Sequence, residues 1–133
     1  MSYEIPIIGR DVSLEEYGQQ ILRTGRRCHL VVSDEQLLGL MNVHALNSVP
    51  REEWPFTSVQ AAMIPRDRIL WAAPDQPLLP LLGRMLAADV NQVPVMSEAP
   101  GDSLRSRVLG MVTRDSILRV IQTHIEFRMP AAA

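Results

Sequence analysis

One short segment of the sequence brings together polar side chains that could hold a ligand. Residues 109–118 are LGMVTRDSIL, so Thr113 and Asp115 follow an apolar run and begin a stretch with helical character. A hydroxyl beside the free amides of a helix start favours an anion, and a carboxylate can accept protons from two adjacent hydroxyl groups. A shorter echo, LGLMNVHAL at 38–46, has Asn42 in place of the threonine. The same local design is therefore used twice, with different polar groups.

No other group of residues forms a catalytic or metal-binding constellation in the sequence. Cys28 and His29 are adjacent in a predicted strand, so their side chains point to opposite faces and cannot grip one metal ion. Neighbouring glutamates on a helix suit a solvated face, not an acid/base pair across a cleft. The residues set aside for these reasons, or for want of a spaced partner, are His44, His124, Glu15, Glu16, Glu52 and Glu53. We expect no enzyme activity, no metal site and no required cofactor.

The composition is that of one folded domain. The chain has 133 residues, 47% hydrophobic and 21% charged, with a net charge of -2. This is enough apolar material for a core and gives no positive field to recruit nucleic acid. A single cysteine excludes an internal disulfide and points to a reducing compartment. No apolar run approaches the length of a membrane span, so we expect a cytoplasmic domain without direct membrane insertion.

The first half of the chain has the order helix, strand, strand, helix. Apolar residues at helical spacing, a capping box at the start and a glycine at the end predict a helix at 13–25. Strands are predicted at 28–32 and 37–42, on either side of a polar turn, followed by a short helix at 43–49. The glycine of the second strand stands near its start, as in the second copy.

The second half repeats this order, with a helix at 75–89, strands at 92–96 and 108–113, and a helix at 116–127. Equivalent apolar positions lie 64 residues apart through the first strand of each copy and 71 apart from the second strand onward. The change of seven residues falls in the polar loop at 97–107. Insertions are tolerated in surface loops, so the shift is consistent with a duplicated unit.

The segment between the copies is punctuated by proline and contains a predicted helical turn at 58–63. Trp54 and Trp71 are expected to anchor this segment against the repeats. Strands at 3–8 and 68–72 are candidates to lead into the two copies.

These boundaries divide the chain into repeat 1 (3–49), a linker (50–66), repeat 2 (67–127) and a flexible tail (128–133). One such unit cannot cover both faces of its small sheet. We therefore expect an α/β fold in which two repeats pack sheet to sheet around a pseudo-twofold axis.

This pattern resembles the cystathionine β-synthase (CBS) domain family, whose β-α-β-β-α repeats occur in pairs. The resemblance is carried by VNQVPV at 90–95, similar to the hydrophobic-Pro-Val strand of the family, and by VLGMVTRDSIL at 108–118, similar to its Gly-hydrophobic-hydrophobic-Thr turn. SVQAAMIP at 58–65 looks like the Val-x-x-x-Met-Thr-Pro entry segment, with Ile64 replacing threonine. The likeness covers residues 3–125.

A narrower likeness is carried by VPREEWPFTSVQAAMIPRDRI at 49–69. It is similar to the regulatory CBS pairs appended to site-two-type membrane zinc metalloproteases. Neither the His-Glu-x-x-His motif nor the membrane helices of those enzymes occur in this sequence. The resemblance implies an attached or partner membrane protease, with this chain as its regulatory part.

The family resemblance also implies a ligand site. Adenosine-containing ligands bind between the repeats of CBS pairs: the Thr or Ser bonds phosphate or ribose, an Asp three positions later accepts ribose hydroxyls, and the hydrophobic-Pro-Val backbone lines the base. Transferred residue by residue, the implied ligand-binding residues are Thr113, Arg114, Asp115, Ser116, Val93, Pro94, Ile64 and Pro65, with a weaker first-repeat site at Asn42 and Ala45.

The second repeat departs from the family at the carboxylate position, because the residue three places after Thr113 is Ser116. Asp115 comes one residue early, which turns it by about 100° on a helix. The first repeat lacks a carboxylate at the position of Ala45. A threonine at a strand-to-helix junction also caps free amides without any ligand. Both interpretations, capping alone and ligand contact, stay open from the sequence.

The resemblance implies a non-catalytic regulatory module that senses a small ligand, with an adenine nucleotide or S-adenosylmethionine as the candidate. Such a module controls an attached or partner protein by motion of one repeat against the other. The alternative is a purely structural module that dimerises through the helices at 13–25 and 77–89 and has vestigial clefts. A homodimer is expected, and an attached protease would tether this cytoplasmic chain to a membrane.

Overall fold

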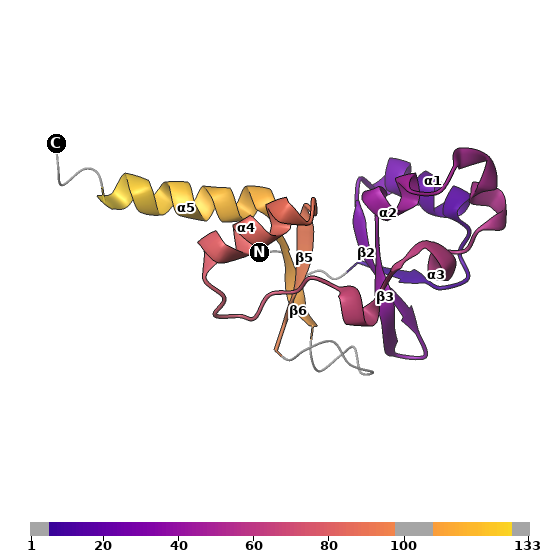
Figure 1. The fold of residues 1–133 in the computed structure, drawn as a ribbon, viewed down its shortest axis with the longest axis horizontal. Helices are drawn as coiled ribbons and strands as arrows, with labels where there is room; N and C mark the ends of the chain where they lie inside the picture. Colours follow the sequence, from indigo (N-terminus) through magenta and orange to yellow (C-terminus); the bar gives the residue numbers. More distant parts are fainter. Residues whose placement is uncertain (1–5, 98–107, 129–133) are drawn as a thin grey trace.

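The computed structural model describes residues 6–97 and 108–128. Figure 1 shows the elements of the first half gathered at one end of the long axis and those of the second half at the other. The elements in chain order are β1 (Ile7–Gly9), α1 (Leu14–Thr24), β2 (Cys28–Ser33), β3 (Gln36–Asn42), α2 (Val43–Asn47), η1 (Arg51–Phe56), α3 (Val59–Ala62), β4 (Ile64–Pro65), η2 (Arg66–Arg68), α4 (Leu78–Ala87), β5 (Gln92–Met96), β6 (Val108–Thr113) and α5 (Arg114–Arg128). The mixed α/β class expected from the sequence is confirmed.

The first sheet has four strands in the order β1-β2-β3-β4, in which β1 is parallel to β2 and the other pairs are antiparallel. Its last strand, β4, comes from the linker and pairs with β3 at Gly39 and Leu40. A Cβ atom at Gly39 would lie 2.7 Å from the sulfur of Met63 and closer still to the carbonyl oxygen of Ile64. Only glycine lets the linker approach β3 so closely, so Gly39 fixes where β4 pairs with the edge of the sheet.

The second sheet pairs β5 with β6 in the register expected from duplication. Val31 pairs with Gly39 in the first repeat and Val95 with Gly110 in the second, and both ladders shift register directly afterwards. The entry strand expected at 68–72 is reduced to one parallel bridge, Ala72 to Val95, since Arg68 belongs to η2 and residues 69–71 pair with no strand. Of the strand expected at 3–8, residues 7–8 are in β1 and residues 3–5 lie outside the described residues.

The first helix of each repeat, α1 and α4, begins and ends close to the positions expected from the sequence. Fewer of their apolar residues are buried than the helical spacing predicts. Ser13 caps α1 through the amide of Glu16 at 3.1 Å, and Gly25 ends the helix at a φ of 72°. Leu22, one of the apolar residues at helical spacing that predicted α1, is 87% exposed, and its equivalent Leu86 on α4 is 56% exposed. Each helix contacts the sheet through only part of its apolar side, which leaves these two leucines unburied.

The two tryptophans anchor the linker as expected. The indole N–H of Trp54 donates to the carbonyl of Val49 at 2.9 Å, and its ring lies against α1 at Gly18. The guanidinium of Arg51 lies 5.2 Å from the centre of the Trp54 ring. Trp71 is half-buried against a cluster formed by residues of both sheets. The Val-Pro-Arg-Glu-x-Trp segment therefore has a packing role within this chain.

One hydrophobic cluster joins the two sheets. The faces of β2 and β3 that contribute to it meet residues of β5 and β6, and the cluster consists of Cys28, Leu30, Leu37, Leu40, Ile69, Met96, Val108 and Met111. Each repeat has one further hydrophobic cluster of its own, under its helices. The expected sheet-to-sheet packing is confirmed, and it sets the starts of α2 and α5 on either side of the contact between the repeats.

Candidate functional site

A cleft of 910 Å³ lies between the two repeats. Its walls come from the start of β2, the junction of β3 with α2, the segment that leads into β5, and the junction of β6 with α5. The lining residues are 25–28, 42–44, 89–92 and 113–115, with Pro6, Asn47, Leu82, Leu86, Met111 and Leu118. The starts of α2 and α5 therefore border one shared cavity.

A reciprocal set of hydrogen bonds caps the start of α5. The amide of Ser116 donates to the Thr113 hydroxyl at 3.1 Å, and the amide of Thr113 donates to the Ser116 hydroxyl at 3.2 Å. The Ser116 hydroxyl donates to the Thr113 carbonyl at 2.9 Å, and the Thr113 hydroxyl donates to the Ser116 oxygen at 3.2 Å. Serine at the family's carboxylate position thus completes a capping box, and both hydroxyl protons are used within it.

Asn42 has the equivalent capping role at the start of α2. Its side-chain oxygen accepts from the amide of Ala45 at 2.8 Å. Ala45 itself is buried, so the first repeat presents a side-chain amide and no hydroxyl at this point of the cleft. The capping interpretation of the sequence therefore holds in both repeats, and contact of Thr113 with a ligand remains a prediction.

Arg114 and Asn91 form a polar pair on the wall contributed by the second repeat. The Nε of Arg114 donates to the side-chain oxygen of Asn91 at 2.9 Å, and a terminal nitrogen of the same guanidinium bonds that oxygen as well. The Arg114 amide also donates to the Asn91 carbonyl, at 3.0 Å. Arg114, one of the ligand-binding residues implied by the resemblance, is thus held against the cleft wall by its own repeat.

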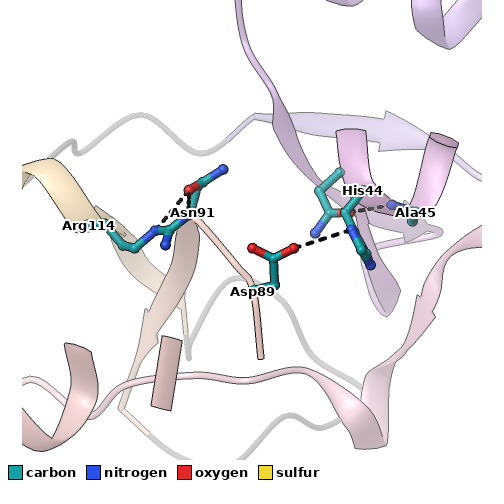
Figure 2. Close-up of polar contacts among 6 residues, drawn as sticks. His44, Ala45, Asp89, Asn91 and Arg114 are labelled. Atoms are coloured by element: carbon teal, nitrogen blue, oxygen red, sulfur yellow. Dashed lines mark hydrogen bonds and ion pairs between the residues drawn. The ribbon is translucent and has the colours of Figure 1, made fainter. Parts of the chain in front are cut away.

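A second pair crosses the cleft from one repeat to the other. His44 of α2 and Asp89, just after α4, face each other with Nδ1 and Oδ2 3.9 Å apart, as Figure 2 shows beside the Arg114–Asn91 pair. Both side chains are exposed. An exposed pair at this separation contributes little to stability, but it marks where the two repeats come close at the cleft mouth.

Behind the cleft wall, the start of β2 is held by a buried polar group. The Tyr17 hydroxyl donates to the carbonyl of Met41 at 3.2 Å, which leaves Nδ1–H of His29 to donate to the phenol oxygen across 2.9 Å. Burial lowers the pKa of His29, and the charge of Arg26 adds to this effect. Burial also raises the pKa of the Tyr17 phenol, with a further contribution from Cys28.

The adjacent Cys28 points to the other face of the strand, into the cluster between the sheets. Burial raises the pKa of its thiol to about 12, so the sulfur is a neutral core group and not a nucleophile at physiological pH. Within residues 6–97 and 108–128 no three His, Cys, Asp or Glu side chains gather where a metal ion could be held. In the same ranges, no helix has both the length and the apolar character needed to cross a bilayer.

Comparison with known proteins gives the fold a name. The family model of the CBS domain matches residues 61–123. A CBS-domain protein from Agrobacterium tumefaciens superimposes with a TM-score of 0.73 at 17% identity, over 90% of each chain. The chain folds as a tandem CBS pair. No curated protein sequence is similar enough to match it.

Two further structures with a similar fold were solved with ligands. The CBS domain pair of protein MJ0100, in complex with 5'-methylthioadenosine and S-adenosyl-L-methionine, has a TM-score of 0.66 at 18% identity over 91% of each chain. The cytosolic domain of the Mg²⁺ channel MgtE, in complex with ATP, has a TM-score of 0.64 at 21% identity, over 90% of this chain and 46% of that chain. At these identities the likeness establishes the fold and leaves the ligand of this CBS pair to its own residues.

The cleft of the CBS pair takes in only some of the residues expected from the sequence. Thr113, Arg114, Asp115 and Asn42 line it. Ser116 and Ala45 lie one turn into their helices and take part in the caps. The remaining expected residues lie away from the lining: Val93 and Pro94 are buried in β5, and Ile64 and Pro65 form β4 against β3.

Several lining residues were missed from the sequence, above all Arg26, Arg27, His44, Asp89 and Asn91. Two of them carry a recoverable signal, because Arg27 and Asn91 are 64 residues apart and so occupy equivalent places in the repeats. The His44–Asp89 pair has no such signal, since these residues meet only through the packing of one repeat on the other.

Proposed function

We propose that this CBS pair is a non-catalytic regulatory module that binds an adenine-containing ligand between its repeats. The observation that carries the proposal is the cleft of 910 Å³ bordered by both helix starts. A ligand that fills it touches both repeats, so a difference in its affinity for two repeat arrangements shifts the balance between them. The adenosine ligands held by MJ0100 and the ATP held by MgtE support an adenine-containing ligand.

The chemistry of the lining supports binding and not turnover. The described carboxylates at the cleft are Asp89, which faces His44, and the exposed Asp115. Neither is set against a nucleophile, and the Thr113 hydroxyl is engaged with Ser116. Its second lone pair can still accept a proton from a ribose hydroxyl.

The test is calorimetric titration of the chain with AMP, ADP, ATP, 5'-methylthioadenosine and S-adenosylmethionine, beside thermal unfolding with each. We expect at least one to bind, and Thr113→Ala to weaken it about fivefold through loss of one hydrogen bond. Asn42→Ala is the matched control because it removes the equivalent cap in the other repeat. No heat and no thermal shift with any of the five would overturn the proposal, and weakening by Asn42→Ala alone would refute the choice of repeat.

A second candidate is a module that acts through contact between two copies, with the cleft unused. It is favoured by the exposure of Leu22 and Leu86, which are equivalent positions on α1 and α4. The same titration separates the candidates when light scattering is run on each sample. A dimer that binds none of the five ligands would establish the second candidate in place of the first.

The output of the module is proposed from the segment around Arg51 and Trp54. Its likeness to the regulatory pairs of membrane zinc metalloproteases supports an attached or partner protease of that kind. Genomic sequence preceding Met1 tests this, since it should encode membrane spans with a His-Glu-x-x-His motif.

A further inference from the structure

Charged side chains are unequally distributed over the cleft. Arg26, Arg27 and Arg114 line it, against the two carboxylates Asp89 and Asp115. Asp89 is paired across the cleft with His44, and Asp115 is exposed. The cavity between the repeats therefore carries an excess of positive charge, in a chain whose net charge is negative.

The three arginines are not equally engaged. Arg114 directs Nε and a terminal nitrogen to Asn91, and Arg26 has polar contacts of its own. Arg27 is exposed, and within residues 6–97 and 108–128 no side chain is hydrogen-bonded to or paired with its guanidinium. Of the three, Arg27 can therefore turn to a ligand without giving up a contact inside the described protein.

The pseudo-twofold symmetry explains why Arg27 lacks such a partner. The amide of Val43 donates to the Arg27 carbonyl at 3.2 Å, just as the amide of Arg114 donates to the Asn91 carbonyl at 3.0 Å. The second repeat thus places arginine on the helix and asparagine before the strand. The first places Arg27 before the strand and Val43 on the helix, and the valine side chain has no acceptor that the Arg27 guanidinium could bond.

The helix starts do not supply the charge recognition themselves. In the capping box of α5 the hydroxyl protons of Thr113 and Ser116 are directed to oxygens within the box. At α2 the oxygen of Asn42 is taken by the amide of Ala45, which leaves only the uncharged NH2 group of Asn42 as a side-chain donor. A phosphate needs donors, and the guanidinium group supplies several in a fixed geometry that suits phosphate oxygens.

We infer that the cleft selects its ligand by negative charge through Arg27, so that adenosine polyphosphates are bound in preference to neutral or cationic adenosine derivatives. This rests on the proposed function and names the ligand class of the same cleft. The preference is opposite to that of a pocket built for a sulfonium cation, because the sulfonium of S-adenosylmethionine would meet the excess of arginine.

The test is calorimetric titration of the full chain with ATP, AMP, adenosine and S-adenosylmethionine, repeated with Arg27→Gln. We expect ATP to bind at least about tenfold more tightly than adenosine or S-adenosylmethionine, with an affinity that falls as salt is raised. Arg27→Gln should weaken ATP about tenfold and leave adenosine unchanged. Arg23→Gln is the matched control, an exposed arginine of α1 outside the cleft, and it should change neither affinity.

Three outcomes overturn the inference. S-adenosylmethionine or adenosine binding as tightly as ATP would remove the charge selectivity and leave the proposed function standing. An ATP affinity of Arg27→Gln equal to that of Arg23→Gln would remove the role of Arg27, again without touching the proposed function. Absence of heat with all four probes would overturn the inference, and the same absence with ADP and 5'-methylthioadenosine would overturn the proposed function as well. Circular dichroism of each variant confirms that it is folded before titration.

Discussion

Removing the hydroxyl of Tyr17 tests how the start of β2 is held in place, and with it Arg26 and Arg27, which line the cleft just before this strand. Tyr17 has no exposed surface, and its hydroxyl donates to Met41 at 3.2 Å and accepts from His29 across 2.9 Å. Tyr17→Phe keeps the ring and its edge-to-face contact with the imidazole, whose centre lies 5.1 Å away. The substitution therefore isolates the two hydrogen bonds.

The expected cost follows from the groups left behind. The imidazole N–H would lose its partner in a buried site, which costs about 1–3 kcal/mol. The Met41 carbonyl, which lies opposite His29 in the β2–β3 ladder, would lose a second hydrogen bond worth about 0.5–1.5 kcal/mol. Because His29 keeps slight access to solvent, we expect the two losses to sum to about 2–4 kcal/mol. For a chain of this length that corresponds to a melting temperature lowered by roughly 10 °C.

Urea unfolding followed by tryptophan fluorescence measures this loss, since Trp54 reports on the first repeat and Trp71 on the contact with the second. The control is Thr123→Val, which deletes an exposed hydroxyl that bonds the carbonyl of Arg119 on α5 and should change the free energy of unfolding by less than about 0.5 kcal/mol. A loss in Tyr17→Phe no larger than in the control would refute the idea that this buried pair holds β2.

Two further perturbations test the fold. Gly39→Ala should destabilise the chain by about 1–3 kcal/mol in urea unfolding because its Cβ would press on the carbonyl of Ile64. The control Gly83→Ala, with open space around it on α4, should be neutral or stabilising. Equal effects of the two substitutions would contradict the close approach of β4 to Gly39. Burial, with the charge of Arg26 adding to it, lowers the pKa of His29 below the ordinary 6.5, so the unfolded chain takes up a proton that the folded chain excludes, and the free energy of unfolding should fall as pH drops below about 6.5. His29→Gln should show a shallower fall, and an unchanged slope would disprove the assignment.

The order and nature of most elements follow from local signals in the sequence. The capping box of α1, the glycine that ends it and the alternation of strands with helices are properties of neighbouring residues, and the structure has them as expected. The exposure of Leu22 and the single bridge at Ala72 were not foreseen. Both depend on which surface the rest of the chain leaves available, and helical spacing or β propensity does not contain that information.

The candidate site divides in the same way. Capping is a local property, and the sequence offered it for Thr113 as one of two open interpretations, whereas the equivalent cap by Asn42 was found only in the structure. The cleft also brings together Arg27 with Arg114, and His44 with Asp89, from segments 45 or more residues apart. Only the packing of one repeat on the other places them at one cavity. Sequence motifs drew attention to Val93 and Pro94, which are buried in β5, and to Ile64 and Pro65, which pair with β3 away from the cleft lining.

The two repeats agree in backbone and differ in side chains at the cleft for a physical reason. Equivalent amide-to-carbonyl bonds, Val43 to Arg27 and Arg114 to Asn91, join strand and helix in each repeat, and losing either would leave backbone groups unsatisfied. The polar side chains of the cleft are outside the core clusters, to which the lining contributes Cys28, Met111, Leu82 and Val90, so folding constrains the identity of the polar residues little. A duplicated fold can therefore keep one cavity while its two halves become chemically unequal, as the placement of Arg27 before its strand and of Arg114 on its helix shows.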